Sequence, residues 1–271
     1  MPQIHPTAVV DARAELGDDV EIGPYVIIQG HVVIGAGAII HSHSVVYGHS
    51  VIGRNCRIGP SAYIGMEPQH RSNAGVGTSC YIGDETTIRE TAQVNRATRP
   101  GPEHATRLGA RCFLMAGAHV GHDCQIGDDV TMANAVLLGG HVTVGERVFF
   151  GGGSGVHQFC RIGRLTVVAG IEQITRDVPP FAAVRYGGLK AYNAIGCRRF
   201  GLDRESIQAI RGAYRCLHSN RTIPDAIAAI RATVPDVPVA AEIIAFATAK
   251  GRGLQPSVHF LNRLAAGDDS N

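Results

Sequence analysis

Four histidines and one aspartate near the middle of the chain have the types and spacing that best suit catalysis. They are His119, His122, Asp123, His141 and His157. A histidine beside a carboxylate can act as a general base, because the carboxylate holds the imidazole in the tautomer that accepts a proton. The sequence therefore predicts that His122 abstracts a proton and that Asp123 or a nearby carbonyl oxygen orients its ring.

These residues lie within a long six-residue repeat. An aliphatic residue recurs at every sixth position from Ile4 to Ile64. The rhythm resumes from Ile82 to Val94 and again from Leu108 to Ile174. A period of six does not keep aliphatic side chains on one face of a helix, whereas hexapeptide repeats are typical of a parallel β-helix. Each hexapeptide is then a short strand with its aliphatic side chain inside. We expect the glycine that often follows it to relax the backbone at the corner.

Stacking of the repeats predicts a second catalytic feature. Three hexapeptides complete one coil, so residues 18 positions apart stack, which places Gly140 above His122 and His141 above Asp123. A glycine there leaves open space and an exposed backbone N–H beside the base. Such an N–H can stabilise an oxyanion. The pattern therefore favours acyl transfer, with His122 as base and Gly140 as oxyanion donor.

The rhythm breaks twice, at residues 66–79 and 99–105. Insertions in a repeat protein usually lie on its binding face, so we interpret both as loops that project from the prism towards the site. The alternative is that they only relieve strain or cover an edge. The prism should end near Val178, because Pro179 and Pro180 stop strand pairing.

The rest of the chain indicates helices, so we predict a β-helix domain over 1–184 and a helical domain over 185–271. Asp203 suits a helix N-cap, and an apolar stripe follows it up to Asn220. Two further helices are expected near 224–233 and 237–250. Together they would cover the open end of the β-helix.

Composition narrows the classes of protein. The formal net charge is +2 and only 18% of residues are charged, which gives no reason to expect nucleic-acid binding. No apolar run approaches the roughly 20 residues of a membrane span, and the first residues do not form a signal peptide, so we expect a cytoplasmic protein. Four of the seven cysteines share one phase of the repeat, which indicates small core residues rather than a redox or metal site: Cys56, Cys112, Cys124 and Cys160.

Several segments together resemble one family. They are His119–Cys124, Gly140–Val142, Val156–Cys160, Asp177–Pro180, Ile64–Gly65 with Pro68–Gln69, and Ser206–Arg211. This combination is similar to the UDP-N-acetylglucosamine O-acyltransferases that begin lipid A biosynthesis. The resemblance implies a left-handed β-helix and a homotrimer with active sites between neighbouring prisms. It also implies acyl carrier protein as donor of a 3-hydroxyacyl chain, the 3-hydroxyl of UDP-N-acetylglucosamine as acceptor, and no cofactor or metal.

The resemblance also assigns roles to residues. His122 falls on the family's base, with Asp123 beside it, and Gly140 falls on the oxyanion amide. Gly170 matches the position that sets the depth of the acyl pocket. The remaining matches line the sugar, acyl or nucleotide path: Gln69, His119, His141, His157, Gln158, Asn193 and Arg199.

Some positions depart from the family, and they cluster around the nucleotide sugar: His70, Ser72, Asn95, Ile195 and Phe200. These departures leave open a different acceptor, such as an amino sugar nucleotide. A second alternative is a zinc enzyme like the γ-carbonic anhydrases, although the three-residue spacing of His119 and His122 does not match their ligand spacing. A third is that all four histidines are structural.

Overall fold

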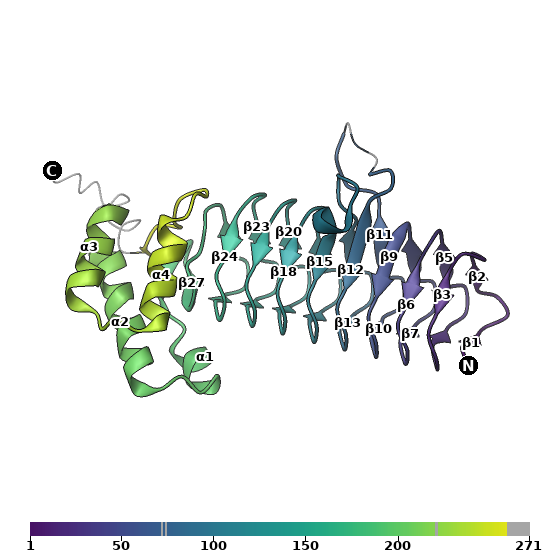
Figure 1. Cartoon of the computed structure of the whole chain (residues 1–271), viewed down its shortest axis with the longest axis horizontal. Helices are drawn as coiled ribbons and strands as arrows, with labels where there is room; N and C mark the ends of the chain where they lie inside the picture. Colours follow the sequence, from purple (N-terminus) through teal and green to yellow (C-terminus); the bar gives the residue numbers. More distant parts are fainter. Residues whose placement is uncertain (72, 74, 220–221, 259–271) are drawn as a thin grey trace.

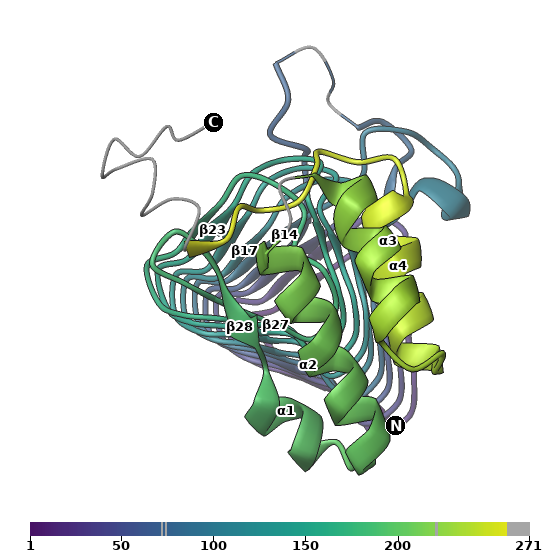
Figure 2. The ribbon, with the colours of Figure 1, turned by 90° about the vertical axis from the view of Figure 1, so that its left-hand side faces the viewer.

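The computed structural model describes residues 1–71, 73, 75–219 and 222–258. Within these residues the chain forms a long left-handed parallel β-helix that carries a group of helices at its C-terminal end (Figure 1). Viewed along the axis, the coils superimpose as a triangular prism and the helices lie across its end (Figure 2). The predicted fold class is confirmed.

Each side of the prism is one sheet, and in the described residues the three sheets have eleven, nine and eight strands. Sheet A contains β1 (Gln3–Ile4), β4 (Glu21–Ile22), β7 (Ile39–Ile40), β10 (Arg57–Ile58), β13 (Thr87–Ile88), β16 (Phe113–Leu114), β19 (Thr131–Met132), β22 (Phe149–Phe150), β25 (Val167–Val168), β27 (Ala182–Arg185) and β28 (Gly188–Tyr192). Sheet B contains β2 (Val9–Val10), β5 (Ile27–Gln29), β8 (Val45–Tyr47), β11 (Tyr63–Met66), β14 (Gln93–Asn95), β17 (His119–Val120), β20 (Leu137–Leu138), β23 (Gly155–Val156) and β26 (Gln173–Ile174). Sheet C contains β3 (Glu15–Leu16), β6 (Val33–Ile34), β9 (His49–Ile52), β12 (Ser79–Ile82), β15 (Thr106–Leu108), β18 (Gln125–Ile126), β21 (Thr143–Val144) and β24 (Arg161–Ile162).

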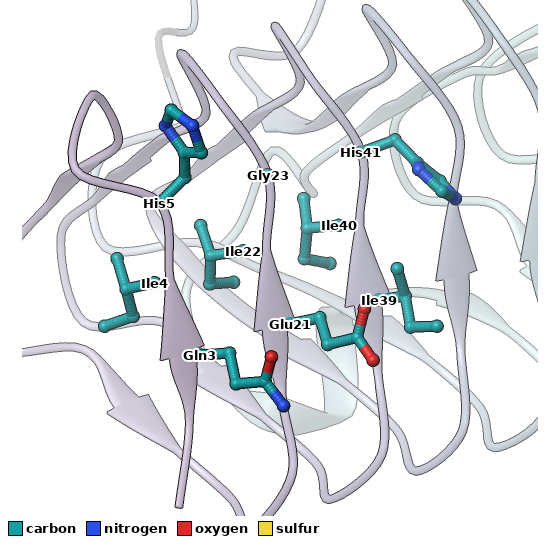
Figure 3. Close-up of a pocket in the computed structure, with 9 residues that line it drawn as sticks. All are labelled: Gln3, Ile4, His5, Glu21, Ile22, Gly23, Ile39, Ile40 and His41. Atoms are coloured by element: carbon teal, nitrogen blue, oxygen red, sulfur yellow. The ribbon is translucent and has the colours of Figure 1, made fainter.

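The aliphatic residue of each hexapeptide fills the inside of the prism. Ile4 pairs with Ile22, and Ile22 pairs with Ile40 on the next coil, as Figure 3 shows for the strands that line a surface hollow at the N-terminal end. Ile22 and Ile40 are buried, whereas Ile4 in the first coil is 47% exposed. Beyond the first coil, the repeat supplies a continuous apolar core of the kind that drives folding.

The glycine after each aliphatic residue has a different role from the one we predicted. A Cβ at Gly35 would lie 2.7 Å from the backbone of the next coil, so glycine is required there for close stacking. The left-handed backbone at the corners is carried mainly by residues other than glycine, such as Asp123 at φ 61° and His141 at φ 60°. Short polar side chains tolerate this conformation better than branched ones.

Both insertions leave the prism at the same edge, between sheets B and C. The first connects β11 to β12 and the second connects β14 to β15, which includes the short 3₁₀ helix η1 (Pro102–His104). Figures 1 and 2 show them projecting together from this edge. The core residues stay paired across both, since Ile64 pairs with Val94 and Val94 with Val120, and the register shifts only after Ile64, where the first insertion begins. The insertions therefore add to the prism without disturbing its core.

The prism does not end at Pro179 and Pro180. After these residues β27 continues sheet A by pairing in parallel with β25, and β28 returns antiparallel beside β27. The prediction of the end was wrong because the two prolines lie in a corner between strands, where a missing N–H does not interrupt a ladder.

Four helices follow in the described residues: α1 (Ala194–Arg199), α2 (Arg204–Ser219), α3 (Ile223–Thr233) and α4 (Pro238–Thr248). The three predicted helices correspond to α2, α3 and α4, and Asp203 caps α2 by accepting a 2.7 Å hydrogen bond from the Ser206 N–H. Asn220, where we placed the end of the first, lies outside the described residues. Helix α1 was not predicted. None of the described helices is both long and apolar enough to cross a membrane.

Buried Asp177 fastens the C-terminal segment to the prism. Its carboxylate accepts two hydrogen bonds from the Arg161 guanidinium, at 2.8 and 3.0 Å, and one from the Arg252 N–H at 3.1 Å. Arg161 also donates to carbonyl oxygens at the end of α4. The four cysteines at one phase of the repeat are free and buried, as predicted, and burial raises the pKa of the Cys124 thiol to about 12.

Candidate active site

The edge between sheets B and C gathers most of the predicted site residues. His122 and Asp123 lie between β17 and β18, and His141 follows Gly140 between β20 and β21 on the next coil. The stacking prediction is confirmed, because the His141 N–H donates a 2.9 Å hydrogen bond to the His122 carbonyl oxygen. His157 and Gln158 lie one coil further along the same edge and are exposed.

His122 and Asp123 form a closely bonded pair. The Nδ1 atom of His122 lies 2.7 Å from Oδ2 of Asp123, and His122 is only 9% exposed. Because an ionised carboxylate can only accept hydrogen bonds, Nδ1 carries the proton of the neutral imidazole. The Nε2 atom then has a free electron pair, which is the state that a general base needs.

The Asp123 carboxylate remains ionised in spite of its burial. Burial alone would raise its pKa, but hydrogen bonds from the Thr98 N–H, from His122 and from the Thr98 hydroxyl hold the pKa below its usual value. Nε2 of His141 lies 3.5 Å from Oδ2 of the same carboxylate. Asp123 therefore presents a charged acceptor to His122 over the neutral pH range.

Gly140 lies directly against the imidazole of His122. A Cβ at Gly140 would be 2.5 Å from Cε1 and 2.7 Å from Nε2 of His122, so any side chain would displace the ring. Among the described residues, no carbonyl or side chain accepts a hydrogen bond from the Gly140 N–H. An N–H without an acceptor beside a base is available to a developing negative charge.

Two further histidines line the same edge and stay neutral more readily than usual. Burial, followed by the proximity of His122, lowers the pKa of His119. Burial also lowers the pKa of His141, although Asp123 acts in the opposite direction. The His141 ring stacks on Phe159, with ring centroids 4.6 Å apart. The rings of His119, His141 and Phe159 therefore form an aromatic surface of low charge beside His122.

The first insertion brings a residue to the base that we had considered only as a departure from the family. The ring of His70 packs edge-on against His122, with centroids 5.8 Å apart. Gln69 beside it is exposed. Sequence reasoning missed this contact because the insertion has no period from which a spatial position follows.

Thr98 and Thr106, which flank the second insertion, were also missed. The Thr98 N–H and hydroxyl donate to the two carboxylate oxygens of Asp123, at 3.0 and 2.9 Å. The Asp123 N–H donates to the Thr106 hydroxyl at 2.8 Å. The only signal in the sequence was their position at the ends of a break in the repeat.

Three predicted site residues lie away from the edge that carries His122. Gly170 lies between β25 and β26, at the edge between sheets A and B. Asn193 caps α1 and donates a 2.8 Å hydrogen bond to the carbonyl oxygen of Leu165, at the edge between sheets C and A. Arg199 ends α1. One chain does not bring these residues together with His122.

The departures from the family differ in their surroundings. Asn95 is buried, and its amide donates to the Glu67 carbonyl oxygen at 2.6 Å. Ile195 is exposed. Phe200 forms a cation–π contact with Arg147, whose Cζ lies 4.6 Å from the ring centroid. Ser72 lies outside the described residues.

His122, Asp123 and His141 offer three ligand atoms within 4.8 Å of one another in the described part of the chain. Three protein ligands would be enough for a catalytic zinc ion. However, Nδ1 of His122 and Oδ2 of Asp123 are bonded to each other, and the Thr98 hydroxyl also donates to Oδ2. A metal ion would have to replace these hydrogen bonds, so the donor set fits an oriented base better.

Family models match three parts of the chain. Residues 105–140 match a bacterial transferase hexapeptide model of six repeats, and residues 177–255 match domain 2 of UDP-N-acetylglucosamine O-acyltransferase. Residues 2–98 match a GMPPB C-terminal domain model. The fold and the edge site, with these matches, define a hexapeptide-repeat transferase.

Individual relatives make the class more specific. An acyl-[acyl-carrier-protein]–UDP-N-acetylglucosamine O-acyltransferase from Alkalilimnicola ehrlichii is 45% identical over 94% of this chain and 99% of its own length. One from Anaeromyxobacter is 41% identical over 55% of this chain, and that alignment spans 59% of the relative. The solved UDP-N-acetylglucosamine acyltransferase of Francisella novicida is 30% identical with a TM-score of 0.89, covering 97% of this chain and 98% of that one. The chain belongs to the acyl-[acyl-carrier-protein]–UDP-N-acetylglucosamine O-acyltransferase family.

Proposed function

We propose that this protein transfers a 3-hydroxyacyl chain from acyl carrier protein to the 3-hydroxyl of UDP-N-acetylglucosamine, the first step of lipid A biosynthesis. The relatives carry the name of this reaction. The observation that supports the proposal most strongly is the arrangement at one edge of the prism. Nδ1 of His122 is bonded to Asp123 at 2.7 Å, and the Gly140 backbone adjoins the other side of the ring.

In the proposed mechanism His122 acts first as a base and then as an acid. Its Nε2 takes the proton of the sugar hydroxyl while the oxygen attacks the thioester carbonyl carbon. A C–O bond forms, and the carbonyl oxygen becomes an oxyanion that accepts a hydrogen bond from the Gly140 N–H. When the C–S bond breaks, the thiolate of the carrier protein takes the proton from the imidazolium. Asp123 stabilises the imidazolium between these steps.

We assign the other residues to the substrates. Gln69, His119 and His141 would line the sugar and acyl path, Gly170 would set the depth of the acyl pocket, and His157 and Gln158 would face the phosphates. Asn193 and Arg199 would contact the nucleotide. A glycine at position 170 would admit a longer chain than a larger residue.

The positions of these residues support a homotrimer with sites between neighbouring prisms. His122 lies at one edge of the prism, whereas Gly170 and Asn193 lie at the other two and Arg199 ends α1. A complete site would therefore combine edges of two chains. The outer face of sheet B offers an apolar surface for such contact, with exposed side chains at Val9, Ile27, Tyr63 and Leu137.

We also propose that the boundary between the β-helix and the helical domain lies near residue 184, and that the protein acts in the cytoplasm, where acyl carrier protein would be its partner.

The proposal is tested by offering purified protein a 3-hydroxyacyl carrier protein with UDP-N-acetylglucosamine or its 3-amino analogue. We expect an ester of the first sugar, detected by mass spectrometry. A product from the amino sugar alone would indicate that His70 and Asn95 belong to a site for a different acceptor. The absence of any product would contradict acyl transfer to a nucleotide sugar.

A further inference from the structure

The catalytic pair is held by a hydrogen-bond network that extends into both insertions. Asp123 lies in a corner with left-handed backbone at φ 61°, so its side chain needs partners that keep it aimed at His122. Thr98 provides two of them, through its N–H to Oδ1 and its hydroxyl to Oδ2. Oδ2 is also the atom that accepts the hydrogen bond from His122.

The network continues from Thr98 into the first insertion. The side-chain amide of Asn73 donates a 2.8 Å hydrogen bond to the Thr98 carbonyl oxygen. The same side chain accepts a 2.7 Å hydrogen bond from the Gly75 N–H, which fixes its orientation. The first insertion therefore reaches the catalytic pair from two directions, through Asn73 and Thr98 to Asp123 and through the ring of His70 to His122.

The second insertion contributes on the other side of Asp123. Thr106, which is fully buried, accepts the Asp123 N–H. The carbonyl oxygen of Ala105 accepts a 2.8 Å hydrogen bond from the side chain of Gln125, on the strand that follows Asp123. Thr98 and Thr106 thus stand at the two ends of the second insertion, and both form hydrogen bonds with Asp123.

We propose that Thr98 is a positioning residue for the reaction, which holds the Asp123 carboxylate against His122 and connects it to the first insertion through Asn73. This inference rests on the proposed function of His122 as the base. The Thr98 side chain donates its hydrogen bond to Asp123, so it acts on the base through this carboxylate.

The charged and titratable groups around Asp123 set the expected pH dependence. They are His122 beside it, His141 on the next coil, His70 from the first insertion, Arg99 from the second, and His119 on β17. Hydrogen bonds to a carboxylate favour its ionised form. Loss of the Thr98 hydroxyl should therefore raise the pKa of Asp123, and the part of the acid limb that reports protonation of this carboxylate should move to higher pH.

The test compares Thr98→Val with Thr98→Ser. Valine keeps the shape and the backbone N–H but removes the hydroxyl, whereas serine keeps the hydroxyl. A hydrogen bond to a charged group is strong enough that Thr98→Val should lower kcat by about 10- to 100-fold. We expect little change in KM for the sugar and a shift of the acid limb of the pH–rate profile to higher pH. In Thr98→Ser both kcat and the pH–rate profile should return towards those of the wild type.

Thr86→Val is the matched control. The Thr86 hydroxyl donates to the Gly109 carbonyl oxygen at 2.9 Å and accepts the Cys112 N–H at 3.1 Å, at an edge away from the catalytic pair. This variant should lower the melting temperature without moving the pH–rate profile. Equal profiles for Thr98→Val and wild type, or an equal loss in Thr98→Ser and Thr98→Val, would overturn the proposal.

A double variant separates positioning from general damage. If Thr98 acts through Asp123, Thr98→Val should cause no further loss in an Asp123→Ala background, whereas an additive loss would overturn the proposal. If the wild type transfers no acyl chain, the proposed function fails, and Thr98 is then tested without turnover. For this, the pH titration of His122 is followed by NMR with labelled histidine. Protonation of Asp123 should change the chemical shift of His122, and this change should occur at higher pH in Thr98→Val. An unchanged titration curve would overturn the role of Thr98.

Discussion

Replacing His122 with alanine is expected to lower kcat by about 100- to 10,000-fold, the usual contribution of a general acid–base residue. The variant loses the Nε2 atom that takes the proton of the sugar hydroxyl. His141 lies against Asp123 from the next coil, but it is not bonded to the carboxylate at the 2.7 Å distance of His122. The measurement is the initial rate of ester formation at saturating substrates.

The fold should survive this substitution. His122 lies in a corner outside the aliphatic core, and its backbone carbonyl oxygen keeps the hydrogen bond from the His141 N–H. Circular dichroism and the melting temperature should therefore match the wild type. His5→Ala, in the first coil of the prism and exposed, serves as a control that should keep full activity. A His122→Ala variant with wild-type kcat would contradict the assignment of the base.

Gly140→Ala is expected to cause the second large decrease in kcat, although alanine keeps the backbone N–H. The added Cβ would lie 2.5 Å from Cε1 and 2.7 Å from Nε2 of His122. The imidazole must then move, and a displacement of about 1 Å at a catalytic group can cost about 100-fold in rate. We expect kcat to fall by about this factor, with the rate of ester formation as the measurement.

Gly155→Ala provides the matched control for this substitution. Gly155 lies on a strand where an added Cβ would come no closer than 4.0 Å to its nearest neighbour, the Leu137 carbonyl oxygen. It should keep wild-type kcat when size-exclusion chromatography shows the wild-type assembly state, which is checked because Gly155 pairs with Leu137 on the face proposed for contact between chains. If Gly140→Ala were as active as Gly155→Ala, the space beside His122 would not matter for the reaction.

The repeat allowed a large part of the fold to be predicted from the sequence. A period of six with an aliphatic residue at a constant phase has few structural solutions, and stacking by 18 residues places Gly140 beside His122 and His141 beside Asp123. The predicted role of the glycines was wrong, since the pattern does not distinguish a need for left-handed backbone from a need for close stacking.

The missed residues lie where the period stops. His70, Asn73 and Thr98 belong to the insertions or their ends, and their contacts depend on how each loop folds back onto the prism. Likewise Asn193 follows the last strand and caps α1, so its distance from His122 depends on the tertiary structure. Periodicity predicts the prism, whereas the contacts of the loops require three-dimensional coordinates.

The most direct measurement is a crystal structure of the protein with the acylated nucleotide sugar. We expect the ester oxygen at the sugar 3-position within hydrogen-bond reach of Nε2 of His122, and the ester carbonyl oxygen facing the Gly140 N–H. We also expect the nucleotide to contact Asn193 and Arg199 of a neighbouring chain. A sugar bound away from the edge that carries His122 would contradict the proposed site and its chemistry.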